Sequence, residues 1–290
     1  MMMILFILVL QKSREGSAAL ILSGQRSDAS EMKILQEQTG EGISLAVHFF
    51  KVARNIFTLD FGNTIGGKSV VHSIAESFVF TIILASFAGV LAFLYGTGLG
   101  IYGHYNPSAR KALEKINYIM MAVPVFIVAL ALLWIFSLSL QWFFPGGVDS
   151  GMWFVLPGIA LGLKSGSHIY VFTDEFMRRE LEKQYVRTAT AFGYKKNKIF
   201  SKYIFKNMFL PLFSFWLLEL GSYLSGAAIV EMVYSIPGIG YLLLRALLRY
   251  DINLLVGILV FVAAIMFIIT LIQEYIDQVY AGYQGLQDER

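Results

Sequence analysis

The stretch DEFMRRELEKQYVRTATAFGYKKNKIFSKYIFKNMFLP, Asp174–Pro211, decides the fold because it places a long polar segment between two strongly apolar runs. Its apolar side chains recur every three to five residues, which is typical of an amphipathic helix. They are Phe176, Leu181, Tyr185, Ala189 and Phe192. Gly193 then interrupts the pattern and is a natural helix end. We predict a second helix over Lys195–Leu210, or, as an alternative for the whole segment, an interfacial helix lying on acidic lipid.

The composition of the chain points to a membrane protein. Of 290 residues, 57% are hydrophobic and 15% are charged, which is more apolar surface than a soluble domain of this size can bury. A helix of about 20 apolar residues crosses a bilayer. Five runs reach that length: Ser77–Tyr102, Asn117–Phe144, Trp153–Thr173, Met208–Val233 and Ile252–Ile272. We predict an all-α integral membrane protein.

The N-terminus adds a shorter apolar run, Met1–Leu10, which we interpret as the remnant of a first span or as a short tail in the membrane interface. With it, we expect about six transmembrane helices, the first one truncated or incomplete. The expected organisation is this remnant (1–10), an external region (11–75), a five-span core (76–273) and a C-terminal tail (274–290).

The basic residues predict the orientation. Loops rich in lysine and arginine face the cytoplasm. The loop His104–Ile116 carries three such residues and Asp174–Asn207 carries nine, whereas Gln141–Met152 has none and Glu231–Asp251 has two. These loops alternate along the chain, so we expect segment 174–207 and the C-terminal tail to be cytoplasmic.

A nucleotide-binding motif occurs in DFGNTIGGKSVV, Asp60–Val71, where Gly62, Gly67, Lys68 and Ser69 satisfy G-x-x-x-x-G-K-[ST]. A functional phosphate loop needs a buried strand before it and a soluble helix after it. Here a predicted membrane span follows, and the orientation places the loop outside the cell. We therefore expect it not to bind nucleotide.

Three segments together resemble a known family. QYVRTATAFG, followed eighteen residues after Gly193 by Pro211, resembles the cytoplasmic coupling loop of ATP-binding-cassette (ABC) importer permeases. GAAIVEMVYSIPGIGYLLLRALLRYDINLLVGILV resembles the signature across the fifth span and outer loop of the dipeptide/oligopeptide/nickel branch. The stretches SAALILSG and HFFKVARNIFTLDFGNTIGGKSVVHSIAESFVFTIILA resemble the external region of that branch's B-type subunit, between its first and second spans. An arginine pair that the family usually has near the end of the fourth span is replaced by Val171 and Asp174.

This resemblance implies a type I ABC importer permease fold with a cytoplasmic coupling helix at about Tyr185–Tyr194. The chain would be half of the translocation path for peptides or similar small solutes. A second homologous permease would form a heterodimer with it, two cytoplasmic ATPases would bind ATP and Mg, and an external binding protein would deliver the solute. The expected location is a bacterial or archaeal inner membrane. The residues implied in coupling are Tyr185, Arg187, Thr188, Ala189, Ala191, Phe192, Gly193 and Tyr194.

Ionisable residues inside spans are costly and usually face protein or water. Glu219, Lys164, His168 and Glu231 are therefore candidates for the translocation path. Glu219 could instead be a packed, protonated carboxyl. Lys164 and His168 share one helix face, which either lines the path or packs through Gly162 and Gly166. Glu231 could satisfy backbone donors near the outer turn.

The outer turn is formed by Pro237, Gly238 and Gly240, where we expect glycine to supply a positive φ. The four histidines show no ligand spacing and cysteine is absent, so we expect no metal site and no cofactor on this chain. The chain itself is predicted not to be an enzyme. An alternative function is an ion-coupled secondary transporter that works without an ATPase and uses Glu219, Lys164 and His168 for coupling.

Overall fold

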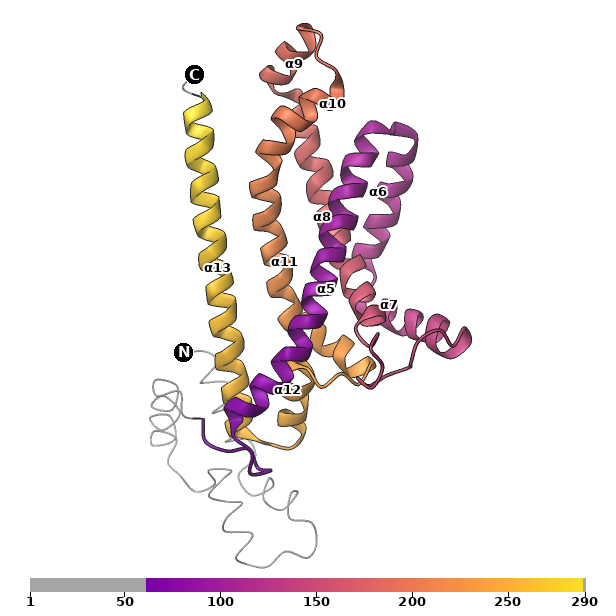
Figure 1. The fold of residues 1–290 in the computed structure, drawn as a ribbon, viewed down its shortest axis with the longest axis vertical. Helices are drawn as coiled ribbons and strands as arrows, with labels where there is room; N and C mark the ends of the chain where they lie inside the picture. The colour runs from indigo at the N-terminus through magenta and orange to yellow at the C-terminus, as the bar shows by residue number, and fades with distance from the viewer. Residues whose placement is uncertain (1–60, 289–290) are drawn as a thin grey trace, which may run out of the picture. The chain divides into compact units, whose positions relative to one another are not determined.

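The computed structural model describes residues 61–288 (Figure 1). The predicted first-span remnant (1–10), most of the external region and His48 lie outside the described residues. Apart from an isolated bridge, the described chain is helical between its turns. It divides into two compact units. The smaller unit contains the described residues up to Val79 and Gly238–Ala264, and the larger unit contains the rest. Helices α5 (Val70–Tyr105) and α13 (Ile252–Asp288) contribute to both.

In the smaller unit, the loop that carries the nucleotide-binding motif folds back on itself. Asn63 and Ser69 form an antiparallel bridge, and the Thr64 and Gly67 N–H groups donate to carbonyls within the loop. The Ile65 N–H donates to Asp251 Oδ2 at 2.8 Å, in the connection between α12 (Ile239–Leu248) and α13. Three backbone donors that a phosphate would need are thus already used.

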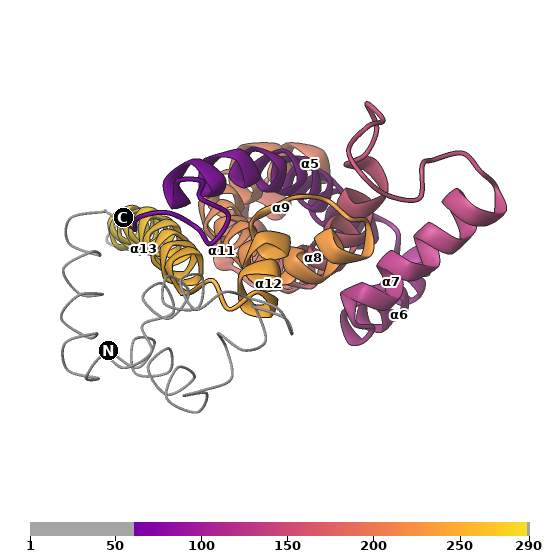
Figure 2. The ribbon, with the colours of Figure 1, turned by 90° about the horizontal axis from the view of Figure 1, so that it is seen from below.

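The larger unit is organised around α8 (Val155–Glu182), which packs against α6, α7 and α11 (Figures 1 and 2). Its contact with α5 depends on small residues. A Cβ atom added at Gly158, Gly162 or Gly166 would lie 2.3–2.5 Å from a side chain of α5. A Cβ at Gly96 of α5 would lie 2.4 Å from the Gly166 carbonyl oxygen. The two backbones therefore approach as closely as in glycine-mediated membrane helix pairs.

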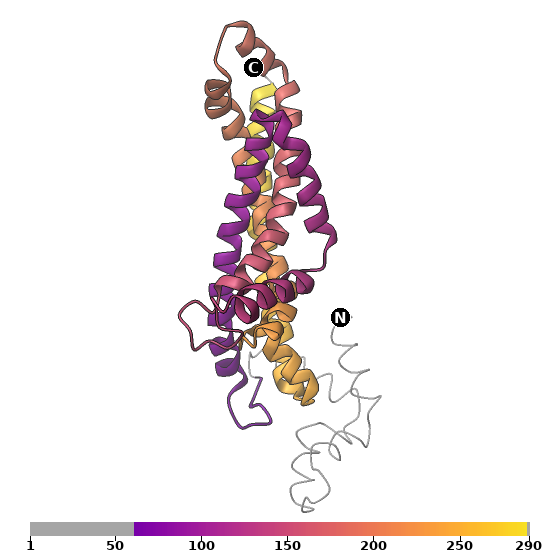
Figure 3. The ribbon, with the colours of Figure 1, turned by 90° about the vertical axis from the view of Figure 1, so that its right-hand side faces the viewer.

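The run Asn117–Phe144, predicted as one continuous span, is broken in the structure. Helix α6 (Pro107–Ala122) ends before Pro124, and α7 (Val125–Leu132) continues into a π-helical segment, Leu133–Ser139. The two parts are bent by 102° (Figure 3). Proline lacks an N–H and disfavours helical backbone at the residue before it, and Val123 is accordingly extended. The run is apolar on both sides of the bend, so its hydropathy did not reveal the break.

The last two predicted spans form long helices. The helix α10 (Lys196–Ile199), a π-helical segment (Phe200–Ile204) and α11 (Phe205–Val233) follow one another directly, so the predicted helix at Lys195–Leu210 merges with the next span. Helix α13 continues to Asp288. Ser214 of α11 donates to Asp277 Oδ1 of α13 at 2.7 Å. The end of α13 lies at the same end of the larger unit as α9 (Figures 1 and 3).

Among the described residues, three helices are long and apolar enough to cross a membrane, and the bent pair adds a fourth crossing if it counts as one. Helix α8 spans 28 residues but is not among them. Its buried side includes serine, threonine and glycine and is covered by neighbouring helices. The predicted all-helical membrane architecture is confirmed.

Candidate functional site

A helical elbow at the basic end of the larger unit contains the predicted coupling residues. Helix α8 ends at Glu182, Lys183 is extended, and α9 runs over Gln184–Ala191. Gly193 has φ +77°, and its N–H donates to the Thr190 carbonyl. The Tyr194 N–H donates to the Ala189 carbonyl, which completes a Schellman motif. The helix–glycine–helix pattern predicted from the sequence is present, and the glycine is required by its left-handed backbone.

The two faces of α9 differ sharply. Val186 and Ala189 are buried in a cluster formed with α8 and with the stretch from Ile199 to Leu212. Ala189, one of the residues that the resemblance implies in coupling, is 7% exposed and faces the body of this chain. The exposed face carries Arg187, Thr188, Thr190, Ala191, Phe192, Gly193 and Tyr194. Phe192 is the most prominent of these, with 78% of its surface exposed.

A buried polar cluster holds α9 against the bundle. Glu180, near the end of α8, is 2% exposed. It accepts a hydrogen bond from the Tyr185 hydroxyl of α9 and pairs with Lys183. The Asn207 amide of α11 lies 3.4 Å from the Tyr185 oxygen and 3.5 Å from Glu180 Oε2. Burial, followed by the bond to Glu180, raises the pKa of Tyr185. Tyr185, which the resemblance implies in coupling, therefore connects three helices of this chain.

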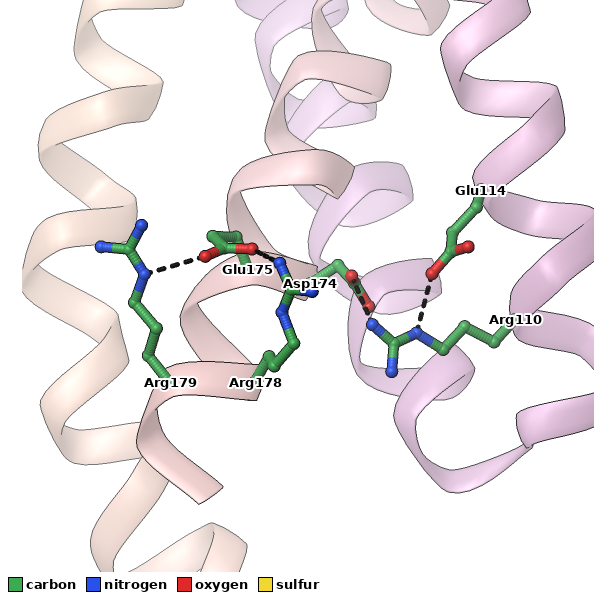
Figure 4. Close-up of polar contacts among 6 residues, drawn as sticks. All are labelled: Arg110, Glu114, Asp174, Glu175, Arg178 and Arg179. Carbon is green, nitrogen blue, oxygen red and sulfur yellow. Dashed lines mark hydrogen bonds and ion pairs between the residues drawn. The ribbon is translucent and has the colours of Figure 1, made fainter. Parts of the chain in front are cut away.

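A second charged cluster joins α6 to α8 near the same end. Arg110 of α6 donates to Glu114 Oε1 at 2.9 Å and to Asp174 Oδ2 of α8 at 2.8 Å. Figure 4 shows Asp174 directed toward Arg110 and Glu175 directed to the opposite side of α8. Glu175 accepts hydrogen bonds from Arg178 and Arg179, which lower its pKa.

Lys164 satisfies the broken end of α6. Its Nζ atom donates to the carbonyl oxygens of Met121 and, at 3.0 Å, Val123, with Met120 O at 3.5 Å. The last carbonyls of a helix have no partner within the helix and carry a partial negative charge. Pro124 cannot donate to them. The lysine thus caps the helix where the bend leaves these carbonyls exposed.

His168, one turn further along α8, has a different partner. Its Nδ1 atom lies 3.0 Å from Glu219 Oε1 of α11. The pair lines an open trough of about 440 Å³, which we call the α8–α11 trough. Its lining residues are Met121, His168, Val171, Phe172, Glu175, Phe176, Arg179, Phe215 and Glu219. Lys164 and His168 are one turn apart on α8, but only His168 lines the trough.

The remaining path candidate, Glu231, is fully buried and is not among the residues that line the trough. The Thr81 hydroxyl of α5 donates to its Oε1 atom at 2.7 Å. At the outer turn, the expected positive φ of glycine is wrong. Gly238 has φ −84° and precedes α12, which includes Gly240, whereas Ser235 has φ 53°. Pro237 lies between these positions.

Comparison with known proteins assigns the chain to a family of membrane transport proteins. The family model for the inner membrane component of binding-protein-dependent transport systems matches residues 96–281. The chain belongs to this family. It is therefore a membrane-spanning permease subunit of an ABC importer, as the sequence resemblance implied.

Two relatives and one solved structure extend the comparison for this permease. The glutathione transport system permease protein GsiC of Salmonella typhimurium (strain LT2) is 28% identical over 231 residues, 79% of this chain and 76% of that protein. GsiC of Escherichia coli (strain K12) is 27% identical over 239 residues, 81% of this chain and 78% of that protein. A chain of the MetNI methionine ABC transporter, in an inward-facing conformation, has a TM-score of 0.62 at 13% identity. The match covers 72% of this permease and 97% of that chain and shows a shared fold.

Sequence reasoning missed Glu180 and Arg110 of this permease. Glu180 lies on the same side of α8 as the buried Thr173 and Met177, at helical spacings of three and four. An acidic residue on the buried side of a helix is the sequence signal that could have identified Glu180. Arg110 gave no comparable signal, because its partner Asp174 is 64 residues away in the sequence.

Proposed function

We propose that this permease forms half of a translocation path for peptide-like solutes and that cytoplasmic ATPases drive it by contacting the exposed face of α9. The observation that carries the proposal is the asymmetry of this helix. One face is buried in the bundle and braced through Glu180, and the other presents Phe192 and Arg187 to the surroundings. A rigid helix with one unpartnered face can transmit the movement of an ATPase to α8 and α11.

The other parts of the proposal follow from the family and from charge. Two ATPases would bind ATP and Mg, a second permease would complete the path as a heterodimer, and an external binding protein would deliver the solute. The basic elbow would be cytoplasmic under the positive-inside rule, together with the end of α13. Peptide-like solutes are proposed because the relatives are named for glutathione, a tripeptide. Alternating access would then open the path to one side at a time.

The α8–α11 trough supports placing His168 and Glu219 on the translocation path. Both line the trough, and ionisable groups at membrane depth usually face water or protein. We assign Lys164 to capping α6, next to the trough, and Glu231 to the packing of α11 against α5. The outer turn at Pro237 is proposed to face the external binding protein.

The ATPase contact can be tested by co-purification of the native complex from its own membranes. Phe192→Ala should weaken ATPase retention, because a central aromatic anchor contributes about 2 kcal/mol or more, roughly 30-fold in affinity. Phe144→Ala is the matched control, since Phe144 is 71% exposed but lies in the predicted outer loop. Equal ATPase retention by the two variants and the unmodified chain would contradict the proposal.

An ion-coupled transporter is the second candidate, favoured only by the His168–Glu219 pair. It predicts solute uptake driven by a proton or sodium gradient in vesicles that contain this chain without ATPases. Uptake that requires ATP and the ATPases would exclude it.

A further inference from the structure

The α8–α11 trough combines one incompletely paired carboxylate with aromatic walls. Glu219 Oε1 is paired with His168, but Oε2 accepts no hydrogen bond from any residue that the structure describes. The Glu219 side chain is 13% exposed and that of His168 is 31% exposed, so both are sheltered yet reachable from the trough. A carboxyl group with an unused oxygen, sheltered from bulk water, favours a cationic or hydrogen-bond-donating partner.

The walls next to this carboxylate are phenylalanine rings. Phe172 of α8 stacks on Phe215 of α11 with centroids 4.6 Å apart and ring planes 7° apart. Phe176 extends the same wall, with its centroid 6.3 Å from that of Phe172. The faces that Phe172 and Phe215 turn toward each other are covered, so an ammonium group can be attracted only by an outer face of this stack, and the attraction is stronger where water is excluded. Phe215 and Glu219 are one turn apart on α11, so ring and carboxylate lie on one face of that helix.

The other carboxylate of the trough, Glu175, already has cationic partners. Glu175 is bonded to Arg178 and, at 2.9 Å, to Arg179 (Figure 4). Both arginines are more than half exposed, and Arg179, the one that lines the trough, lies at its rim rather than in its interior. Residues 168–179 cover about 17 Å along α8, which separates the rim from Glu219. Glu219 is thus the interior charge with remaining hydrogen-bonding capacity.

We propose that the α8–α11 trough is a solute subsite that takes an ammonium group, with Glu219 as the counter-ion and Phe172 and Phe215 as the aromatic wall. This assignment rests on the proposed path function. The ligand class is a primary ammonium such as the amino terminus of a short peptide. A divalent metal ion fits less well, because His168 and Glu219 offer only two ligands and the described residues hold no cluster of three or more histidine, cysteine or acidic groups.

The chain has no cysteine, so a single engineered one reports on the trough. Val171→Cys would be introduced into the assembled transporter, and its modification followed by the mass of this chain. The cationic reagent trimethylammonium-ethyl methanethiosulfonate should modify this cysteine roughly tenfold faster than the anionic sulfonato-ethyl methanethiosulfonate. Both rates are first divided by the rate of the same reagent with a free thiol. Glu219→Gln should abolish this preference. Glu114→Gln removes the same charge outside the trough and should preserve it. Equal rates in the Val171→Cys protein, or a preference that survives Glu219→Gln, would overturn the proposal.

Protection by solutes tests the ligand class. Triglycine should slow the modification of Val171→Cys several-fold more than N-acetyl-triglycine at the same concentration, and Glu219→Gln should remove the difference. Equal protection by the two peptides, or protection by Ni²⁺ alone, would overturn the ammonium assignment. ATPase co-purification measured on the same preparations distinguishes this failure from that of the proposed function, because Glu219 lies far along α11 from the exposed face of α9.

Discussion

The close packing of α5 on α8 predicts opposite outcomes for two alanine substitutions only two residues apart. A Cβ at Gly96 would lie 2.4 Å from the Gly166 carbonyl oxygen and 2.7 Å from Ile169 Cβ. Both are parts of α8 that cannot move without shifting the helix. A Cβ at Gly98 meets no atom within 4 Å among those described. Gly96→Ala should therefore force the helices apart, and Gly98→Ala should not.

The difference in stability between the two variants can be estimated from what they share. Both replace a helical glycine by alanine, so both share a propensity gain of about 1 kcal/mol, which cancels in the difference. What is left is the cost of overpacking at Gly96, about 1–3 kcal/mol. With about 2–4 °C per kcal/mol for a chain of this size, Gly96→Ala should unfold roughly 2–12 °C below Gly98→Ala.

The assay is thermal unfolding of the purified transporter in detergent, followed by the loss of the folded peak in size-exclusion chromatography. The two variants should be prepared at equal concentration and in the same detergent. Equal midpoints, or a Gly96→Ala midpoint above that of Gly98→Ala, would refute the close approach of α5 and α8.

Three further predictions concern single polar contacts. Lys164→Met should lower the free energy of unfolding by about 1–3 kcal/mol, because it leaves the α6 carbonyls unsatisfied, whereas Lys115→Met on the exposed side of α6 should change it little. Tyr185→Phe removes a donor from buried Glu180 and should raise ATP hydrolysis per solute transported, measured by parallel hydrolysis and uptake assays; an unchanged ratio would contradict the bracing role. Burial raises the pKa of Asp251, although its two backbone N–H donors act in the opposite direction. The folded protein therefore holds this proton more tightly than the unfolded chain, in which the pKa is about 4. The free energy of unfolding should decrease as pH rises from about 4 through the pKa of the folded state. As pH falls from 7 to 4, the thermal unfolding midpoint of the unmodified chain should rise more than that of Asp251→Asn. Parallel pH profiles of the two midpoints would contradict this prediction.

The sequence predicted those features that depend on local pattern. The amphipathic period and Gly193 located the elbow at α9, and hydropathy located α5, α11 and α13. These signals depend on residues within a few turns of one another, so they can be read without tertiary information.

The sequence did not reveal features that depend on contacts between helices. Hydropathy is averaged over a window, so the apolar run containing Val123 and Pro124 hid a 102° bend. The resemblance implied Ala189 in coupling, but its burial is decided by packing against the bundle. The separate partners of Lys164 and His168 depend on where α6 and α11 lie around α8. Spacing along one helix could not show this.

The sidedness of the elbow tests the central claim most directly. A cysteine engineered at Tyr194, the only one in the chain, can be labelled with a membrane-impermeant maleimide. We predict no labelling in sealed cells, labelling in inverted membrane vesicles stripped of ATPases, and slower labelling when the ATPases are restored. Labelling from outside in sealed cells would contradict the cytoplasmic position of α9 and the coupling role built on it.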